Sequence, residues 1–175
     1  NSTLAIGPGP YVDIEKIKGL KPDLIIGNKE ENEQAGIDAL MEIAPVWMSD
    51  IFDLDDSIEM IKSVGEITNK SKESNELIAL IRDRFSSLKA VGIKSSVLYF
   101  IWEEPMMLAG KNTFIDAMLQ QCGMKNLAAV ERYPEATGNE NPDFVFLSSE
   151  PFPFRGKHKA NFEKRYPNAK VVLVD

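Results

Sequence analysis

A short pattern that occurs twice constrains the fold more than any other feature of this 175-residue chain. The segments "LKPDLIIGN" at residues 20–28 and "NPDFVFLSS" at residues 141–149 each place Pro-Asp before an apolar run and small polar residues after it. Proline has no backbone N–H and suits the entrance of a strand, and a short apolar run bounded by turn residues is typical of a buried strand. Each copy therefore predicts a core strand.

Segments with helical periodicity alternate with the predicted strands. Ile14, Ile17 and Leu20 recur at helical spacing ahead of the first strand. The longest such segment, about residues 71–89, would form a helix of roughly 28 Å at 1.5 Å per residue. This alternation indicates an α/β layer. The remaining predicted helices cover residues 34–43, 54–67, 112–123 and 157–169, and the remaining strands cover residues 44–50, 95–102 and 170–175.

The two Pro-Asp strands lie on opposite sides of the longest helix in the sequence, which predicts two similar lobes. We expect an α/β fold of two Rossmann-like lobes with parallel sheets, joined by one long backbone helix. The first lobe would cover residues 1–68, the linking helix 69–90 and the second lobe 91–175. Because open α/β sheets bind ligands beyond the carboxyl ends of their strands, we expect a ligand cleft between the lobes.

Charge and composition exclude several classes of function. Lys and Arg number 20 against 27 Asp and Glu, a formal net charge of −7, so a nucleic-acid backbone would be repelled. No apolar run of about 18 residues is present to span a bilayer. The single Cys122 excludes an internal disulfide, and the single His158, in a run that predicts a solvated helix face, excludes zinc sites built from several histidines. We assign no catalytic residue and no metal site.

Polar, aromatic and thioether side chains follow the predicted strands in both lobes. Large flat side chains at the mouth of a cleft suit a broad, partly apolar ligand. The alternative is that each Trp and Met packs under a loop at the edge of the core and that residues 29–32 form a solvated loop. We predict ligand contacts from Asn28, Lys29, Glu30, Asn32, Trp47 and Ser49 in the first lobe, and from Trp102, Met106, Met107, Phe152 and Phe154 in the second.

Four segments taken in order carry a resemblance to a known family. "DIEKIKGLKPDLIIGNKEEN", "PVWMSDIFDLDDSIEMIKSVGEIT", "LAGKNTFIDAMLQQCGMKNLAA" and "NPDFVFLSSEPFPF" resemble the periplasmic binding proteins that deliver cobalamin, ferric siderophores and haem to ABC importers. The resemblance implies two α/β lobes, a linking helix and one ligand held between the lobes. It also implies a monomer that docks onto an importer permease, and a bacterial periplasmic or cell-surface lipoprotein, anchored at most by a lipid.

The family pattern around the first Pro-Asp strand gives one residue a docking role. The segment "IEKIKGLKPD" matches it, so the resemblance assigns contact with the permease to Glu15, which is otherwise an ordinary exposed helix carboxylate. The matching helix of the second lobe has no room near Thr137 and Gly138, so either this protein has lost it or the sequence lacks residues there. The family's opening strand and helix and its closing helix are also missing, so we expect the sequence to be part of a longer exported protein.

The ligand that we favour is a corrinoid such as cobalamin. The two tryptophans fit a broad ligand, and Lys29, Lys111 and Arg155 are the few cations expected near the cleft, whereas anionic ferric catecholates call for several. A ferric siderophore or haem comes next, and in each case the chelate would be cargo and not a cofactor. The alternatives from other classes are an α/β enzyme or sensor domain that uses the same cleft, and a purely structural interaction module.

Overall fold

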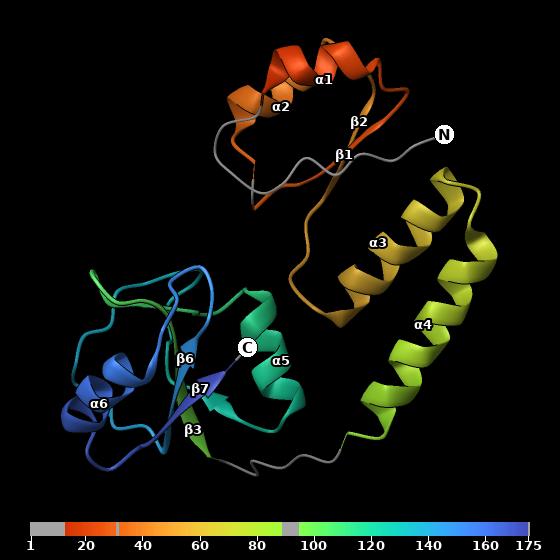
Figure 1. The fold of residues 1–175 in the computed structure, drawn as a ribbon. Helices are drawn as coiled ribbons and strands as arrows, with labels where there is room; N and C mark the ends of the chain where they lie inside the picture. The colour runs from red at the N-terminus through yellow and green to blue at the C-terminus, as the bar shows by residue number, and fades with distance from the viewer. Residues whose placement is uncertain (1–12, 31, 89–94, 175) are drawn as a thin grey trace. The chain divides into compact units, whose positions relative to one another are not determined.

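The computed structural model describes residues 13–30, 32–88 and 95–174, and its helices and strands confirm the α/β class (Figure 1). The chain divides into two compact units, Asn1–Asp50 and Ile51–Asp175. The lobe and linker boundaries expected near residues 68 and 90 stay a prediction. Within the described ranges no helix is long and apolar enough to cross a membrane.

The first unit is a pair of parallel strands with two helices. In β1 and β2, Ile25 pairs with Val46 and Asn28 with Ser49. Helix α1 starts where the Asp13 carboxylate accepts a hydrogen bond from the backbone N–H of Lys16, at 3.0 Å. The elements are α1 (Ile14–Leu20), β1 (Ile25–Asn28), α2 (Gln34–Met41) and β2 (Val46–Ser49).

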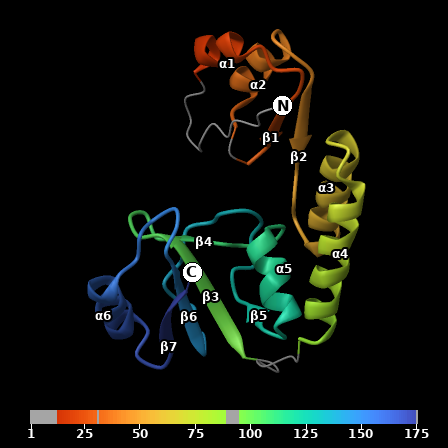
Figure 2. The same cartoon turned by 45° about the vertical axis from the view of Figure 1, so that its right-hand side comes forward.

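The second unit begins with a hairpin of two helices, α3 (Leu54–Ile67) and α4 (Ser71–Ser86), which Figure 2 shows side by side. A Cβ atom at Gly65 would lie 2.2 Å from Oγ of Ser74, so only glycine permits this close approach of the helices. Asn69 takes the left-handed conformation, φ 56°, in the turn between them. The long helix expected at about residues 71–89 is therefore present as α4 and packs against α3.

A five-stranded sheet forms the rest of the second unit. Its order is β4-β3-β6-β7, with β5 paired to the first residues of β3. All pairings are parallel except that of β4, which runs antiparallel to β3. The elements are β3 (Ser96–Trp102), β4 (Met107–Leu108), α5 (Phe114–Gln121), β5 (Lys125–Asn126), β6 (Phe144–Ser148), α6 (Gly156–Arg165) and β7 (Lys170–Val174).

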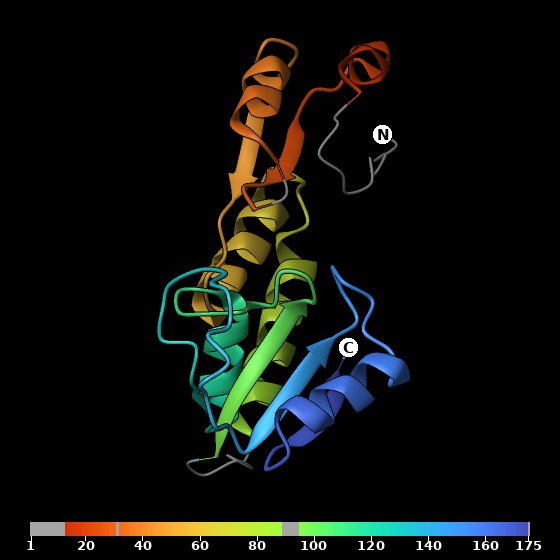
Figure 3. The ribbon, with the colours of Figure 1, turned by 90° about the vertical axis from the view of Figure 1, so that its left-hand side faces the viewer.

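The core of the second unit lies on its central strands. Figure 3 shows β3 and β6 side by side, with α6 packed near them. The ring of Phe100 meets those of Phe162 on α6 and of Tyr166 at the C-terminal cap of α6, at centroid distances of 4.7 and 5.9 Å. The buried apolar side chains of both strands explain why this sheet forms. Those with no exposed surface are Val97, Leu98, Phe100, Val145 and Leu147.

Asp143 of the second Pro-Asp copy ties three strands together. Its carboxylate accepts hydrogen bonds from the backbone N–H and the hydroxyl of Ser96, at 2.7 and 2.8 Å, and its carbonyl accepts one from the N–H of Lys170, at 2.8 Å. The backbone N–H of Ser96, followed by its hydroxyl, holds the pKa of Asp143 below its ordinary value. The aspartate thus joins the starts of β3, β6 and β7.

Candidate functional site

The carboxyl ends of β1 and β2 carry a compact polar cluster. Oδ1 of Asn28 accepts a hydrogen bond from the backbone N–H of Glu30, at 2.8 Å, and the Asn28 carbonyl accepts one from Nδ2 of Asn32, at 2.6 Å. The hydroxyl of Ser49 donates to the carbonyl of Gly27, at 3.3 Å. The structure therefore brings together the polar residues that the sequence predicts in this unit, and their contact with a ligand stays a prediction.

Lys29 extends this cluster but is already paired. Its backbone N–H donates to the carbonyl of Ser49, at 2.9 Å, and its ammonium forms an ion pair with Asp50. The two side chains are 65% and 32% exposed. The positive charge at the end of β1 is thus compensated by the carboxylate of Asp50.

Trp47 lies in β2, two residues before Ser49 of the polar cluster. It is half-buried and pairs in register with Ile26, whose side chain is 47% exposed. Side chains two residues apart on a strand share a face, so Trp47 and Ser49 point the same way. Trp47 and Ile26 therefore form a small apolar surface next to the polar cluster.

The carboxyl end of β3 carries an aromatic and thioether cluster. Trp102 is 38% exposed, donates from Nε1 to the carbonyl of Glu104 at 3.0 Å, and meets the ring of Phe152 edge-on at 5.5 Å. Met107 pairs with Trp102 in the β3-β4 register, and Met106 packs against the core beside them. Four of the residues predicted for the second lobe are thus brought together.

Phe154, the fifth residue predicted for this region, belongs to the hydrophobic core. It is 5% exposed, and its ring packs against those of Phe152 and Phe162, with centroids 4.7 and 5.6 Å apart. It packs against Phe152 on the side of the core. Its contact with a ligand stays a prediction.

His158 is buried, so the prediction of a solvated helix face is wrong at this residue. Its exposed fraction is 7%, and its Nδ1 accepts a hydrogen bond from the backbone N–H of Arg155, at 2.8 Å. The ring lies edge-on to Phe152 and Phe154, at 5.2 and 5.8 Å. A signal was available in the sequence, because His158 lies four residues before the apolar Phe162 and shares its helix face.

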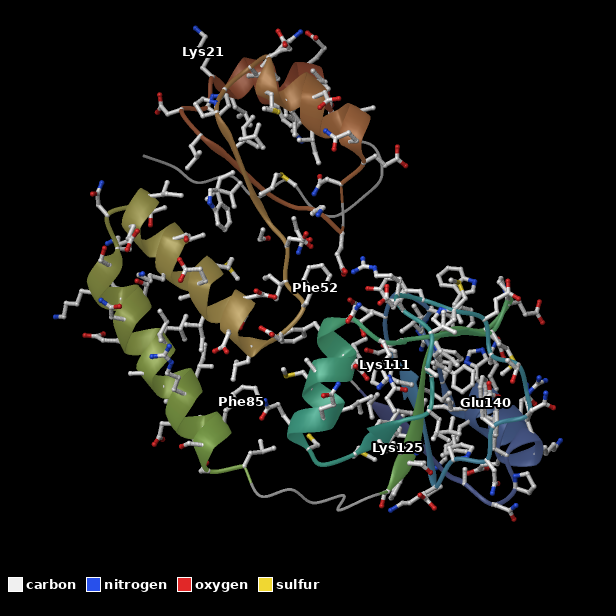
Figure 4. All side chains as sticks on the ribbon, turned by 180° about the vertical axis from the view of Figure 1, so that it is seen from behind. Lys21, Phe52, Phe85, Lys111, Lys125 and Glu140 are labelled. Carbon is white, nitrogen blue, oxygen red and sulfur yellow. The ribbon has the colours of Figure 1, made fainter. Side chains whose placement is uncertain are left out.

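Lys111 belongs to a buried polar network at the start of α5, where Figure 4 shows it beside that helix. Asp116 is 4% exposed, and its Oδ1 accepts from Nζ of Lys111 at 2.9 Å and from Nδ2 of Asn126 at 3.0 Å. Its Oδ2 accepts from Nε2 of Gln120 at 2.7 Å. A second candidate cation of the ligand region is therefore neutralised by a neighbouring carboxylate.

Two arginines of the second unit, Arg132 and Arg155, also bear on the charge of the candidate site. The guanidinium of Arg132 lies over the rings of Phe52 and Tyr133, at 5.6 and 5.3 Å from their centroids, an arrangement that the sequence analysis did not find. Arg155, the third cation expected near the ligand, is exposed at the residue before α6. Distant parts of the chain form the Phe52 contact, so no local sequence signal marks it.

Glu15, the residue predicted to dock onto the permease, lies in the first turn of α1. Its side chain is 83% exposed, and its Oε1 is 3.0 Å from Nζ of Lys18. Contact with a permease stays a prediction. Within residues 13–30, 32–88 and 95–174, no group of three or more His, Cys, Asp or Glu side chains is placed to hold a metal ion.

Comparison with solved structures establishes the two-lobed fold. A substrate-binding protein of an ABC transporter from Listeria monocytogenes has a TM-score of 0.78 at 18% identity, over 93% of this chain and 71% of the other. The periplasmic vitamin B12 binding protein of Vibrio cholerae has a TM-score of 0.71 at 18% identity, over 95% and 70%. The periplasmic haem-binding protein of the same organism has a TM-score of 0.76 at 18% identity, over 94% and 72%.

Comparison by sequence gives the family. No curated protein matches the chain. The family model described as periplasmic binding protein matches residues 5–151, most of the sequence. The resemblance found in the four sequence segments is therefore confirmed, and the chain belongs to the periplasmic binding protein family.

Proposed function

We propose that this protein captures a metal chelate outside the cytoplasm and delivers it to the permease of an ABC importer. Family membership supports the class of function, since the family consists of solute-binding proteins. The similar structures are described as binding vitamin B12 or haem, which supports a chelate as cargo. The ligand would be cargo, and no further cofactor would be needed.

The observation that carries this proposal is the cluster at the carboxyl end of β3. Trp102 is partly exposed and braced by Phe152, and Met106 and Met107 lie beside it. Aromatic rings offer a large flat contact area, and thioethers adapt to irregular apolar surfaces. Such a surface suits the face of a large ring system.

The charges near the strand ends favour a corrinoid over an anionic ferric catecholate. Recognition of a highly anionic chelate calls for several Arg or Lys nitrogens directed at it. Lys29 is paired with Asp50, and Lys111 with Asp116. A chelate with little net negative charge therefore fits better than a polyanion.

Haem is the next candidate, together with less anionic ferric siderophores. Protein-bound haem iron takes axial ligands such as His, Met, Tyr or Cys. His158 is buried with its Nδ1 already engaged, whereas Met106 and Met107 lie in the aromatic region. Cobalamin supplies the axial ligands of its cobalt itself, so the protein need not coordinate the metal, and a corrinoid remains the favoured cargo.

The partner and the location follow from the same proposal. Glu15, exposed on α1, would contact an arginine of the permease. The protein would act as a monomer in the periplasm or at the cell surface, held there at most by a lipid anchor. A permease variant that lacks the partner arginine should lose binding of this protein, whereas Glu15→Gln should weaken the same complex without changing ligand affinity.

Titration with cyanocobalamin tests the proposal. Tryptophan fluorescence, corrected for absorption by the ligand, and equilibrium dialysis would be followed together on the purified protein. Saturable one-to-one binding is expected. Absence of binding in dialysis would overturn the corrinoid assignment and move the test to haem and ferric siderophores. Chromatography of the recovered ligand separates carrier from enzyme, because a carrier returns its ligand unchanged.

A further inference from the structure

Glu103 follows Trp102 directly and stands at the edge of the aromatic cluster. Its side chain is 26% exposed, and its Oε2 lies 3.6 Å from Nε2 of His158. Phe152 links this contact to the aromatic cluster, because its ring meets that of Trp102 at 5.5 Å and that of His158 at 5.2 Å. Glu103 is therefore a half-buried charge that still reaches solvent next to the proposed ligand surface.

His158 is held so that it faces this carboxylate. Its Nδ1 accepts the backbone N–H of Arg155, so in the neutral ring the proton sits on Nε2, the nitrogen nearest Glu103. The rings of Phe152 and Phe154 lie edge-on to the imidazole. Turning the ring would give up the Arg155 hydrogen bond, so the Nε2 edge of His158 stays next to the Glu103 carboxylate.

The charge of Glu103 is not compensated by a lysine or arginine. Among the described residues, no Lys or Arg forms an ion pair with it, in contrast to Asp50 and Asp116, which each have a lysine. Two more carboxylates, Glu104 and Glu150, lie in the segments that follow β3 and β6. Three carboxylates thus follow the strands that carry the aromatic cluster, while the exposed Arg155 precedes α6.

We propose that Glu103 is a charge-selecting residue that disfavours anionic chelates and favours neutral or cationic ones, with His158 as its positioning residue. This inference rests on the proposed function, because it assigns selectivity to the same binding surface. Like charges brought together in a partly desolvated contact repel, whereas a neutral ligand avoids that cost. The effect should therefore appear as a ratio of affinities for ligands of equal shape and different charge.

The matched probes are cyanocobalamin and its monocarboxylic acids, in which one peripheral propionamide is replaced by a carboxylate. Dissociation constants would be measured by equilibrium dialysis with the full chain. For the wild type, at least one acid should bind about fivefold or more weakly than the parent. Glu103→Gln should bring that ratio close to one. Glu76→Gln on α4 removes an equal charge at an exposed position and should leave the ratio unchanged.

A histidine variant tests the positioning role. In His158→Asn the side-chain oxygen can still accept the Arg155 N–H, but the contact with Glu103 is lost. The ratio of affinities for parent and acid should then fall part of the way toward that of Glu103→Gln. A purely structural role would lower the melting temperature and leave the ratio unchanged, which would overturn the positioning role.

The remaining outcomes separate this inference from the proposed function. If cyanocobalamin binds and the ratio is the same in wild type and Glu103→Gln, charge selection by Glu103 is wrong and the carrier function stands. If corrinoids do not bind, two ferric siderophores replace them as probes. One is the iron(III) complex of a linear trihydroxamate with a terminal ammonium group, and the other is its N-acetyl form, which lacks that charge. Glu103→Gln should then reduce the preference of the protein for the ammonium form. If neither class binds, the inference fails, and the proposed function fails with it unless haem binds.

Discussion

The two copies of the Pro-Asp motif start strands in very different surroundings. Asp143 accepts two hydrogen bonds from Ser96 and anchors the starts of neighbouring strands. Asp23, at the same place in the first copy, is exposed, and no described residue donates to its carboxylate. The motif therefore specifies a strand entrance in both units, while its anchoring role depends on which strand lies next to it.

The sheets that follow these motifs differ in the same way. In the second unit the central strands carry side chains with no exposed surface, such as Phe100 and Val145. In the first unit the most buried apolar side chains, such as Ile17 and Leu40, lie on helices, and Ile26 of β1 is 47% exposed. Parallel sheets are stable when both faces are covered, so the second unit should contribute most of the folding stability.

Truncation of one strand residue in each unit should show the largest difference in stability between the two units. Phe100→Ala removes a ring that is fully buried against Phe162 and should lower the free energy of unfolding by about 3–5 kcal/mol. Ile26→Ala should cost less than about 1 kcal/mol because its side chain is already half exposed. Urea unfolding would measure both values.

The two tryptophans make this experiment specific to each unit. Trp47 reports on the first unit and Trp102 on the second, so unfolding would be followed in Trp47→Phe and Trp102→Phe backgrounds. Equal losses of stability from Phe100→Ala and Ile26→Ala would contradict the proposed difference between the units.

The two lysine–aspartate pairs should show the next largest difference in their contribution to stability. Asp116→Ala leaves three donors without their acceptor in a buried place and should cost about 2–3 kcal/mol. Asp50→Ala removes the partner of a lysine that is 65% exposed and should cost less than about 1 kcal/mol. Thermal unfolding at low and high salt would check this, since only the exposed pair should respond clearly to salt.

Replacement of the two tryptophans should also weaken ligand binding to different extents. Trp102→Ala removes the exposed ring of the aromatic cluster and should weaken cyanocobalamin binding by about tenfold or more. Trp47→Ala, on the first unit, should have a smaller effect because Trp47 lies in the middle of its strand. Equilibrium dialysis measures both dissociation constants. Unchanged binding in both variants would show that neither tryptophan surface holds the ligand.

Much of this architecture could be predicted from sequence because periodicity and turn residues are local signals. The long strands and helices, the strand entrances at both Pro-Asp copies and the polar and aromatic residues beyond strand ends all follow from them. Strands β4 and β5 have two residues each, too few for a period to be seen, and were missed. Their existence depends on pairing with β3.

The charge balance of the candidate site could not be predicted, because it depends on contacts made in space. Lys29 and Asp50 lie 21 residues apart in the sequence. The burial of His158 likewise depends on Phe152 and Phe154, which reach it from the segment before α6. Sequence reasoning could thus place candidate cations near strand ends but could not say which of them were already paired.

Replacement of the two motif aspartates should give the smallest difference in stability, and this difference should depend on pH. The folded-state pKa of Asp143 is lowered by hydrogen bonds from Ser96, so its stabilising contribution is fully present above its unfolded pKa and is lost as the pH falls through the folded one. Asp143→Asn should therefore be less stable than wild type at neutral pH, and the difference should shrink below about pH 4.

Asp23→Asn is the matched control, because it makes the same chemical change at the other copy of the motif. Its stability should follow that of the wild type over the whole pH range, since no described residue donates to Asp23. Urea midpoints measured in steps from pH 7 to pH 3 would give both curves. If Asp23→Asn showed the same pH-dependent loss as Asp143→Asn, the motif itself and not the neighbouring strand would set the anchoring, because the two aspartates differ in their partners and share their local sequence.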